Sequence, residues 1–248
     1  SNFSKNNIMN SYSPFKFFIY LIIIGTISQG CRESVHDDSK ASISLVRGDV
    51  EIMPMPSKAL PETINRLSFG SCLSEKEDQS IWTTIADEKP DAFIFMGDNV
   101  YGDAYYKDPA FDDPEMPKMQ AAYYELAQSS HFKKFRNQVP VIPIWDDHDY
   151  GVNDGGASYK FKEESKKLFL KAWNIPSDDV RYQRPGIYSS KILGQKGQKI
   201  QIIMLDTRSF RTELKATDQY NAPGKERYIP STSSEGTLLG LEQWAWLE

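Results

Sequence analysis

The sequence has no cluster of basic residues, no internal repeat and no low-complexity tract. Its 29 Lys and Arg residues are outnumbered by 34 Asp and Glu residues, which gives a net charge of −5. Proteins that bind a nucleic-acid backbone use clustered Lys and Arg to contact phosphates, so a nucleic-acid scaffold is not expected as a partner. Apolar residues make up 40% of the 248 positions, which is enough to form a hydrophobic core in one large domain or two small ones.

Long apolar runs are also missing. The longest run, residues 17–27, is too short to span a bilayer comfortably, because a spanning helix needs roughly 20 apolar residues. Two lysines precede the run, and Gly30 and Cys31 follow it, which is the pattern of a secretory signal. We therefore predict that residues 1–31 form an export segment and that the protein is periplasmic or at the cell surface, attached to the membrane through a lipid on Cys31. A membrane anchor that is never cleaved is the alternative.

Cysteine is scarce, because Cys31 and Cys72 are the only two in the chain. If Cys31 carries a lipid, Cys72 is an unpaired thiol in an oxidising compartment, where a free thiol is a liability unless a metal or another group occupies it. Between the two cysteines, residues 32–63 are predicted to form a polar tether and lead-in. Residues 64–248 are predicted to form the folded domain.

The periodicity of the domain predicts strands and helices that alternate along the chain. Apolar runs predict strands over residues 64–72, 91–98 and 139–149, and a hairpin over residues 186–208 with GQKGQ as its turn. Amphipathic segments predict helices over residues 78–89, 117–130, 131–138 and 160–173, and a further helix that begins at residue 239. This alternation is typical of an α/β fold with a parallel sheet.

Each of the first three predicted strands runs into a turn that carries reactive groups. Cys72 ends the first strand, Asp98 and Tyr101 follow the second, and Asp147 and His148 follow the third. Ligands of α/β sheets bind beyond the carboxyl ends of the strands, so these side chains are expected to meet at one edge. Thiolate, phenolate and carboxylate groups repel one another unless a cation neutralises them. A hard metal suits the oxygen ligands, and iron also accepts thiolate.

His148 lies among three aspartates, Asp146, Asp147 and Asp149. Neighbouring carboxylates favour the protonated imidazole, which suits a proton donor to a leaving oxygen. The turns also have simpler interpretations, because Gly-Asp after a strand is often only a turn and an acidic stretch is often a solvated loop. A calcium loop of the EF-hand type is excluded, since Gly151 stands where a ligand oxygen is needed.

Taken together, five motifs resemble the alkaline phosphatase D (PhoD-like) metallophosphoesterases. They are FGSC at 69–72, PDAFIFMGDNVYGD at 90–103, WDDHDYGVND at 145–154, GIYSS at 186–190 and IIMLDTR at 202–208. The resemblance extends from residue 64 to residue 248. It implies the metallophosphoesterase fold, a four-layer αββα sandwich, and the hydrolysis of a phosphate ester by metal-activated water.

The same resemblance implies a binuclear metal centre, iron plus calcium or another divalent ion. By this likeness Cys72, Asp98 and Tyr101 hold the iron-type ion, and Asp98 bridges to the second ion. Asp147 falls at a ligand position for the second ion. Asn153 is a further candidate ligand.

The catalytic group implied by the resemblance contains His148, Asp149 and Arg208. His148 falls at the position of the proton donor. Arg208, in the LDTR motif, carries a guanidinium that matches the geometry of phosphate oxygens. A structural ion pair between Arg208 and Asp206 is the alternative.

One family feature is missing. The family completes its metal site with a Gly-Asp-x-His type motif on a later strand, and nothing like it follows Arg208. We therefore expect an incomplete αββα sandwich that lacks its C-terminal half. The expected function is that of an exported metal-dependent phosphoric ester hydrolase of the alkaline phosphatase or phosphodiesterase type. The alternatives are a non-catalytic surface lipoprotein that binds calcium or glycan, and an inactive truncated relic.

Overall fold

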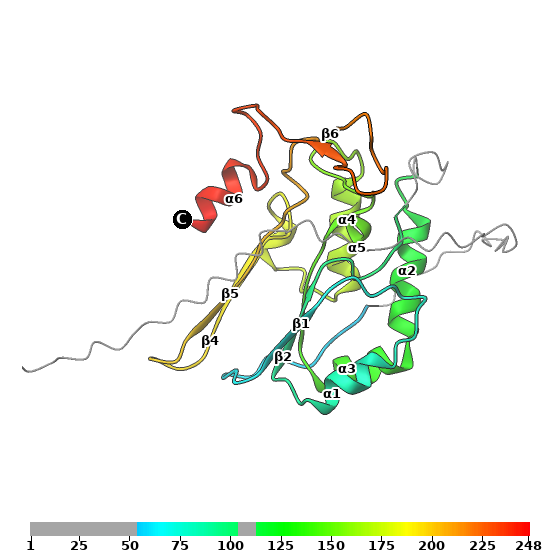
Figure 1. The fold of residues 1–248 in the computed structure, drawn as a ribbon. Coiled ribbons are helices and arrows are strands. Elements are labelled where there is room, and N and C mark those ends of the chain that lie inside the picture. Colours follow the sequence, from blue (N-terminus) through cyan, green and yellow to red (C-terminus); the bar gives the residue numbers. More distant parts are fainter. Residues whose placement is uncertain (1–53, 104–112) are drawn as a thin grey trace, which may run out of the picture. The chain divides into compact units, whose positions relative to one another are not determined.

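The computed structural model describes residues 54–103 and 113–248 and contains a parallel sheet of three strands (Figure 1). Its strands are β1 (Leu67–Gly70), β2 (Ala92–Met96) and β3 (Val141–Ile144), in the order β1-β2-β3. Ile94 on the central strand is in register with Phe69 and Ile142 on either side. The predicted α/β fold with a parallel sheet is confirmed.

The aromatic side chain of Trp82 joins the helices to the sheet. Trp82 lies on α1 (Ile81–Asp87) and packs 4.8 Å, centroid to centroid, from Phe132 and Phe135 on α3 (Ser130–Gln138). Its ring also lies 5.3 Å from that of Phe93 and 5.5 Å from that of Phe95 on β2. Phe93 and Phe95 alternate along the strand and so face the same side of the sheet. Trp82 is therefore the centre of the aromatic core on that side.

Two further helices agree with the predicted positions. They are α2 (Pro117–Gln128) and α5 (Lys162–Ala172). The start of α3 is fixed by Ser129, whose hydroxyl accepts a hydrogen bond from the Phe132 amide, as expected for an N-cap serine. The start of α1 is later than predicted, because Asp78 accepts from the Ser80 amide and the helix begins at Ile81.

The predicted strand over residues 139–149 is wrong at its C-terminal end. The strand ends at Ile144, and residues Asp147–Tyr150 form the short helix α4. The cause is a capping box: the Asp146 side chain accepts from the Asp149 amide, and the Asp149 side chain accepts from the Asp146 amide. The Asp-Asp-His-Asp stretch therefore turns back over the end of the sheet.

The remaining elements follow α5 along the chain. The predicted hairpin is confirmed as β4 (Ser189–Leu193) paired antiparallel with β5 (Ile200–Met204), and Ile202 and Met204 join the core. The predicted terminal helix is α6 (Gly240–Leu247). Besides α4, the 3-10 helix η2 (Val180–Tyr182) and the short hairpin of β6 (Lys215–Ala216) with β7 (Tyr228–Ile229) were not predicted.

Met55 lies within residues 32–63, the segment predicted to form a polar tether and lead-in. Met55 is 1% exposed and lies in the hydrophobic core, and its amide donates to the Ala172 carbonyl at 2.7 Å. Part of the segment predicted as a tether therefore packs on the domain. The predicted export segment, residues 1–31, lies outside the described residues. Within the described ranges no helix combines the length and the apolar character that crossing a bilayer requires.

Candidate metal centre

The backbone at the carboxyl ends of β1 and β2 adopts conformations that most residues avoid. Cys72 has φ 60°, Asp98 has φ 49° and Gly97 has φ 104°. A non-glycine residue with positive φ costs of order 1–3 kcal/mol and persists only where its surroundings hold it, often at functional sites. At Gly97 a Cβ atom would lie only 2.5 Å from the Cβ of Asp146. Glycine therefore lets the turn after β2 pack directly against the turn after β3.

These turns direct two side chains at one oxygen of Asp98. The Cys72 Sγ lies 3.5 Å from Asp98 Oδ2, and the Tyr101 hydroxyl lies 3.4 Å from the same oxygen. Ligands that surround one metal ion at 2.0–2.3 Å are separated by about 3–3.7 Å, so the three groups fit a shared ion. Burial raises the pKa of the Cys72 thiol. A thiol from the turn after β1 and a phenol and a carboxyl group from the turn after β2 meet here.

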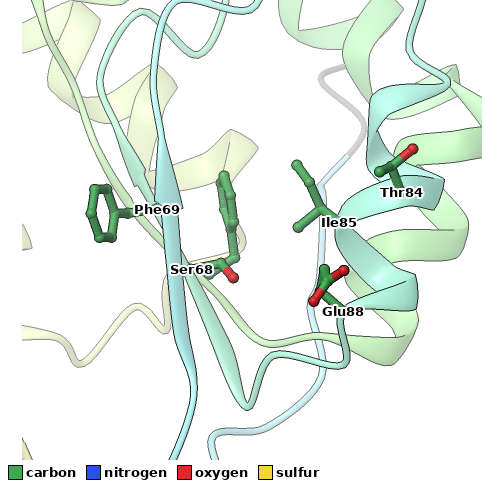
Figure 2. Close-up of a pocket in the computed structure, with 6 residues that line it drawn as sticks. Ser68, Phe69, Thr84, Ile85 and Glu88 are labelled. Atoms are coloured by element: carbon green, nitrogen blue, oxygen red, sulfur yellow. The ribbon is translucent and has the colours of Figure 1, made fainter.

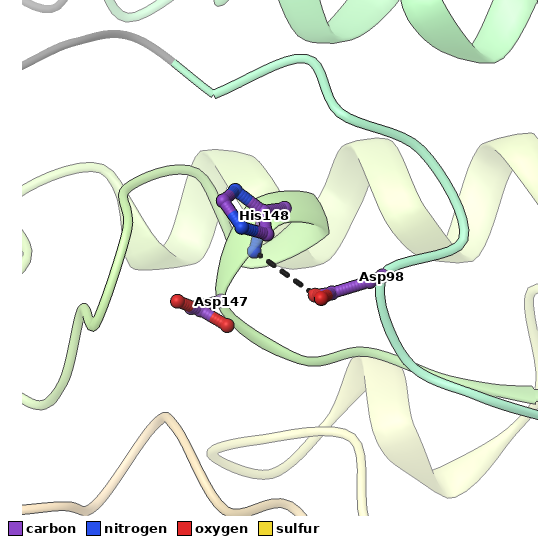
Figure 3. A group of neighbouring side chains, drawn as sticks. All are labelled: Asp98, Asp147 and His148. Carbon is purple, nitrogen blue, oxygen red and sulfur yellow. Dashed lines mark hydrogen bonds between the residues drawn. The ribbon is translucent and has the colours of Figure 1, made fainter. Parts of the chain in front are cut away.

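A second grouping shares Asp98 and adds α4. Asp98, Asp147 and His148 each offer a ligand atom, and these atoms lie within 4.8 Å of one another (Figure 3). The His148 amide donates to Asp98 Oδ1 at 3.3 Å. Burial, and then the nearby Asp147 carboxylate, raise the pKa of Asp98 to about 6. Two buried carboxylates so close together repel each other, and a cation bound between them would stabilise their charged forms.

The imidazole of His148 is held between an acid and a ring. Its Nδ1 forms an ion pair with Asp103 Oδ2 at 3.0 Å, and its ring lies 4.4 Å from that of Tyr101, centroid to centroid. Burial opposes the charged imidazole, but Asp103, and then Asp147 and Asp98, outweigh it and raise the pKa of His148 to about 9. The surrounding carboxylates therefore favour the protonated form of the imidazole.

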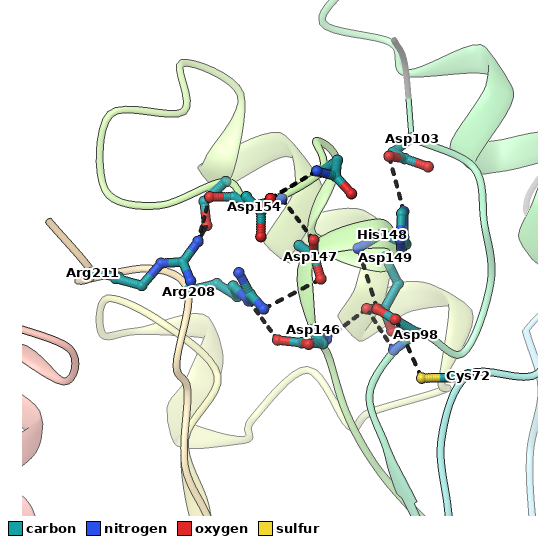
Figure 4. A network of polar contacts seen from close by, with 12 residues as sticks. Cys72, Asp98, Asp103, Asp146, Asp147, His148, Asp149, Asp154, Arg208 and Arg211 are labelled. Atoms are coloured by element: carbon teal, nitrogen blue, oxygen red, sulfur yellow. Dashed lines mark hydrogen bonds and ion pairs between the residues drawn. The ribbon is translucent and has the colours of Figure 1, made fainter. Parts of the chain in front are cut away.

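Arg208 lies on the turn after β5, and its guanidinium contacts Asp146 and Asp147 (Figure 4). Its Nε lies 2.5 Å from Asp146 Oδ1, and its Nη2 lies 3.2 Å from Asp147 Oδ1. Its Nη1 is buried and has no hydrogen-bond partner among the residues that the structure describes. A buried guanidinium nitrogen without an acceptor is costly. We therefore infer that Nη1 donates to an oxygen atom of a ligand.

Family membership follows from a comparison with known sequences. A family described as PhoD-like phosphatase matches residues 67–248. The chain belongs to the PhoD-like phosphatase family. The predicted resemblance is thereby confirmed. No curated protein matches the chain.

The fold of this PhoD-like chain is similar to a solved structure of PhoD. The two share 19% sequence identity with a TM-score of 0.52, and the match covers 75% of this chain and 39% of the solved chain. The chain therefore spans about two fifths of the length of that structure. The likeness supports the predicted PhoD-type α/β fold, of which the described residues form a part.

Asp149 stands apart from the other predicted catalytic residues. Its side chain is buried, and its carboxylate accepts hydrogen bonds from the backbone amides of Asp98, Asn99 and Asp146 and from the Asn99 side chain. Both oxygens are engaged in holding the two turns together. The contacts favour a positioning role for Asp149 in this PhoD-like site, which differs from the catalytic role expected from the sequence.

The predicted alternative for Arg208, an ion pair with Asp206, is not what the structure shows. Asp206 Oδ1 accepts from the backbone amide of Arg208 at 3.0 Å, while the guanidinium pairs with Asp146 and Asp147. Asp206 is buried and also accepts from Trp145 Nε1 at 2.9 Å. Asp206 therefore holds the LDTR turn in place. The sequence motif alone did not reveal this role.

Asn153 is the predicted ligand that the structure leaves outside the group. Its side chain is exposed, and its amide nitrogen donates to Asp154 Oδ2 at 2.9 Å. No individual role was predicted for Asp103 or Asp154. Asp103 pairs with His148, and the Asp154 amide donates to Asp147 Oδ2 at 2.6 Å. The signal for Asp103 was its place at the end of the GDNVYGD motif.

A hollow elsewhere in the domain is unrelated to these residues. It lies between β1 and α1 and is lined by Ser68, Phe69, Thr84, Ile85, Glu88 and Phe93 (Figure 2). None of the predicted metal-binding or catalytic residues borders it. Three of its six lining residues are apolar (Phe69, Ile85 and Phe93) and three are polar, and none belongs to the group around Asp98.

Proposed function

We propose that this protein is an exported, metal-dependent phosphoric ester hydrolase. The observation that carries the proposal is the convergence of Cys72, Tyr101 and Asp147 on Asp98 in a PhoD-like chain. The ligand types fit a binuclear centre of iron plus calcium or another divalent ion, because iron accepts thiolate and phenolate while calcium prefers carboxylate oxygens. Such ions, when bound, polarise phosphoryl oxygens and lower the pKa of water.

The residues of this chain divide the remaining work. Cys72, Tyr101, Asp98 and Asp147 are the side chains that would hold the metal ions. Arg208 binds a phosphate oxygen through Nη1, since Nε and Nη2 are already held by Asp146 and Asp147. This pairing fixes the guanidinium plane before the substrate arrives, which lowers the entropy cost of binding.

His148 donates the proton to the leaving oxygen in this proposal. Asp103 engages Nδ1, so Nε2 is the nitrogen that transfers the proton. A positioned acid of this kind contributes typically 10²–10⁴-fold to a rate. The substrates that fit are phosphate monoesters and diesters. Export and attachment to the membrane through Cys31 belong to the proposal on the basis of residues 1–31 alone.

The test combines metal analysis with turnover of p-nitrophenyl phosphate and bis-p-nitrophenyl phosphate. The wild-type protein is expected to retain metal and to hydrolyse at least one substrate. Asp98→Asn is expected to lower kcat/KM by about 100-fold or more and to reduce the metal content, because the side chain common to both groups of candidate ligands would lose its negative charge. Asp178→Asn, a matched change at an exposed aspartate, is expected to alter neither.

Other outcomes would contradict the proposal. Equal turnover by Asp98→Asn and wild type would remove the role assigned to Asp98. Calcium or glycan binding without turnover would favour the alternative of a non-catalytic surface lipoprotein. Absence of both metal and turnover would favour an inactive relic.

A further inference from the structure

The β6–β7 hairpin carries three planar side chains that pack together. The Arg227 guanidinium carbon lies 5.2 Å from the ring centroid of Tyr220 and 5.6 Å from that of Tyr228. The two rings lie 5.5 Å apart at an interplanar angle of 64°. Arg227 Nη2 also donates to the Tyr220 hydroxyl at 2.9 Å. These residues, called here the Tyr–Arg–Tyr group, have no role in the proposed reaction.

Asp154 connects the Tyr–Arg–Tyr group to the metal centre. Its Oδ2 accepts from the Tyr228 hydroxyl at 2.5 Å and pairs with Arg227 Nη2 at 2.7 Å. Its backbone amide donates to Asp147 Oδ2 at 2.6 Å. Asp154 therefore joins the Arg227 guanidinium to the Asp147 carboxylate through one ion pair and one hydrogen bond. The Tyr–Arg–Tyr group is thus a neighbour of the candidate metal centre, where the organic part of a bound phosphate ester would extend.

Part of the Tyr–Arg–Tyr group remains open to solvent. Tyr220 is 39% exposed, and the Arg227 side chain is 41% exposed. The Arg227 Nε, by contrast, is buried and has no acceptor within residues 54–103 and 113–248. If these residues served only to stabilise the hairpin, we would expect their rings to be buried, because burial of aromatic surface is favourable. An exposed ring beside an ordered guanidinium is the arrangement that stacks on a planar ligand.

We propose that the Tyr–Arg–Tyr group binds the organic part of the phosphate ester and selects substrates whose leaving group is aromatic, such as a phenyl ring or a nucleobase. This inference rests on the proposed phosphate ester hydrolysis. Tyr220 supplies the stacking face, and Arg227 supplies the adjacent cation. Asp154 pairs with Arg227, which donates to Tyr220, so this chain of contacts links the stacking face to Asp147.

The kinetic test compares phenyl phosphate with ethyl phosphate on the metal-loaded protein. Tyr220→Leu is expected to lower kcat/KM for phenyl phosphate about tenfold and to change it by less than about twofold for ethyl phosphate, since one base–aromatic stack contributes 1–3 kcal/mol. Tyr182→Leu is the matched control: Tyr182 is 36% exposed and its hydroxyl bonds to the Ile175 carbonyl. Thermal melting establishes that both variants fold. Equal losses on the two substrates would overturn the inference.

A binding measurement keeps the inference separate from hydrolysis. Phenylphosphonate and methylphosphonate carry P–C bonds that the proposed reaction does not cleave, and calorimetry gives their affinities for the metal-loaded protein. The wild type is expected to bind phenylphosphonate about tenfold more tightly, and Tyr220→Leu is expected to lose that preference. Equal affinities in the wild type would overturn the inference. Selective binding without turnover would contradict only the proposed function.

Discussion

Phe93 and Phe95 on β2 lie among aromatic rings, whereas Asp98 and Tyr101, a few residues further on, lie among carboxylates and a thiol. The strand has ordinary extended backbone and an apolar environment on both faces. The turn after β2 has positive φ at Gly97 and Asp98. Burial and the nearby Asp147 carboxylate raise the pKa of the Asp98 carboxyl group to about 6. The strand and the turn are adjacent in the chain but contribute to the stability of the fold with opposite signs.

The aromatic core stabilises the folded state, whereas the turn after β2 destabilises it. Burial of the rings around Trp82 contributes favourable transfer free energy. The turn after β2 opposes folding through its positive φ and its crowded acids. Asp149 offsets part of this cost, because its carboxylate accepts from the amides of Asp98 and Asn99. The strained turn therefore depends on the core beneath it.

The largest effect on stability is expected from Trp82→Ala. Trp82 is 1% exposed and contacts four aromatic rings, so the substitution should lower the free energy of unfolding by about 3–5 kcal/mol. Chemical denaturation measures the change. Trp244→Ala is the control, because Trp244 is 48% exposed and its loss should cost well under about 1 kcal/mol. Equal losses in the two variants would show that the core is not centred on Trp82.

A smaller effect on stability, with a specific effect on metal binding, is expected from Gly97→Ala. The new Cβ would lie 2.5 Å from the Asp146 Cβ and 2.7 Å from its amide nitrogen. Positive φ and this overlap together should cost about 2–3 kcal/mol and separate the two turns, so metal affinity should fall as well.

Gly197→Ala provides the matched control for that prediction. Gly197 has φ 93°, close to the 104° of Gly97, but a Cβ atom there meets nothing within 4 Å. Only the cost of positive φ, about 1 kcal/mol, is expected, with unchanged metal affinity. If both variants bind metal as the wild type does, the contact between the turns does not shape the metal centre.

The sequence was sufficient to predict the sheet and the meeting of its turns. Apolar runs mark β1 and β2, and parallel strands bring their carboxyl ends to one edge, so the approach of Cys72 to Asp98 followed from order alone. The β4–β5 hairpin was also predictable, because its strands are long enough to show a pattern and GQKGQ marks its turn. Its predicted boundaries still extended beyond the observed strands.

What the sequence could not reveal depends on tertiary contacts. The helix α4 exists because Asp146 and Asp149 cap each other, and an acidic stretch carries no helical periodicity that predicts this. The two-residue strands β6 and β7 are too short for any pattern. Asp149 was grouped with the catalytic residues because it follows His148, yet its carboxylate faces the amides of the turn after β2. Met55 joins the core from the lead-in before β1, where no periodic pattern marked a buried residue.

The central claim is that Cys72 and Asp98 bind the same metal ion. X-ray absorption at the edge of the metal bound to the purified protein tests it most directly, because a thiolate ligand gives a sulfur shell at about 2.3 Å. The account predicts that shell in the wild type and in Asp178→Asn, and its loss in Cys72→Ser. A wild-type spectrum with only oxygen and nitrogen neighbours, or a sulfur shell that persists in Cys72→Ser, would contradict the account.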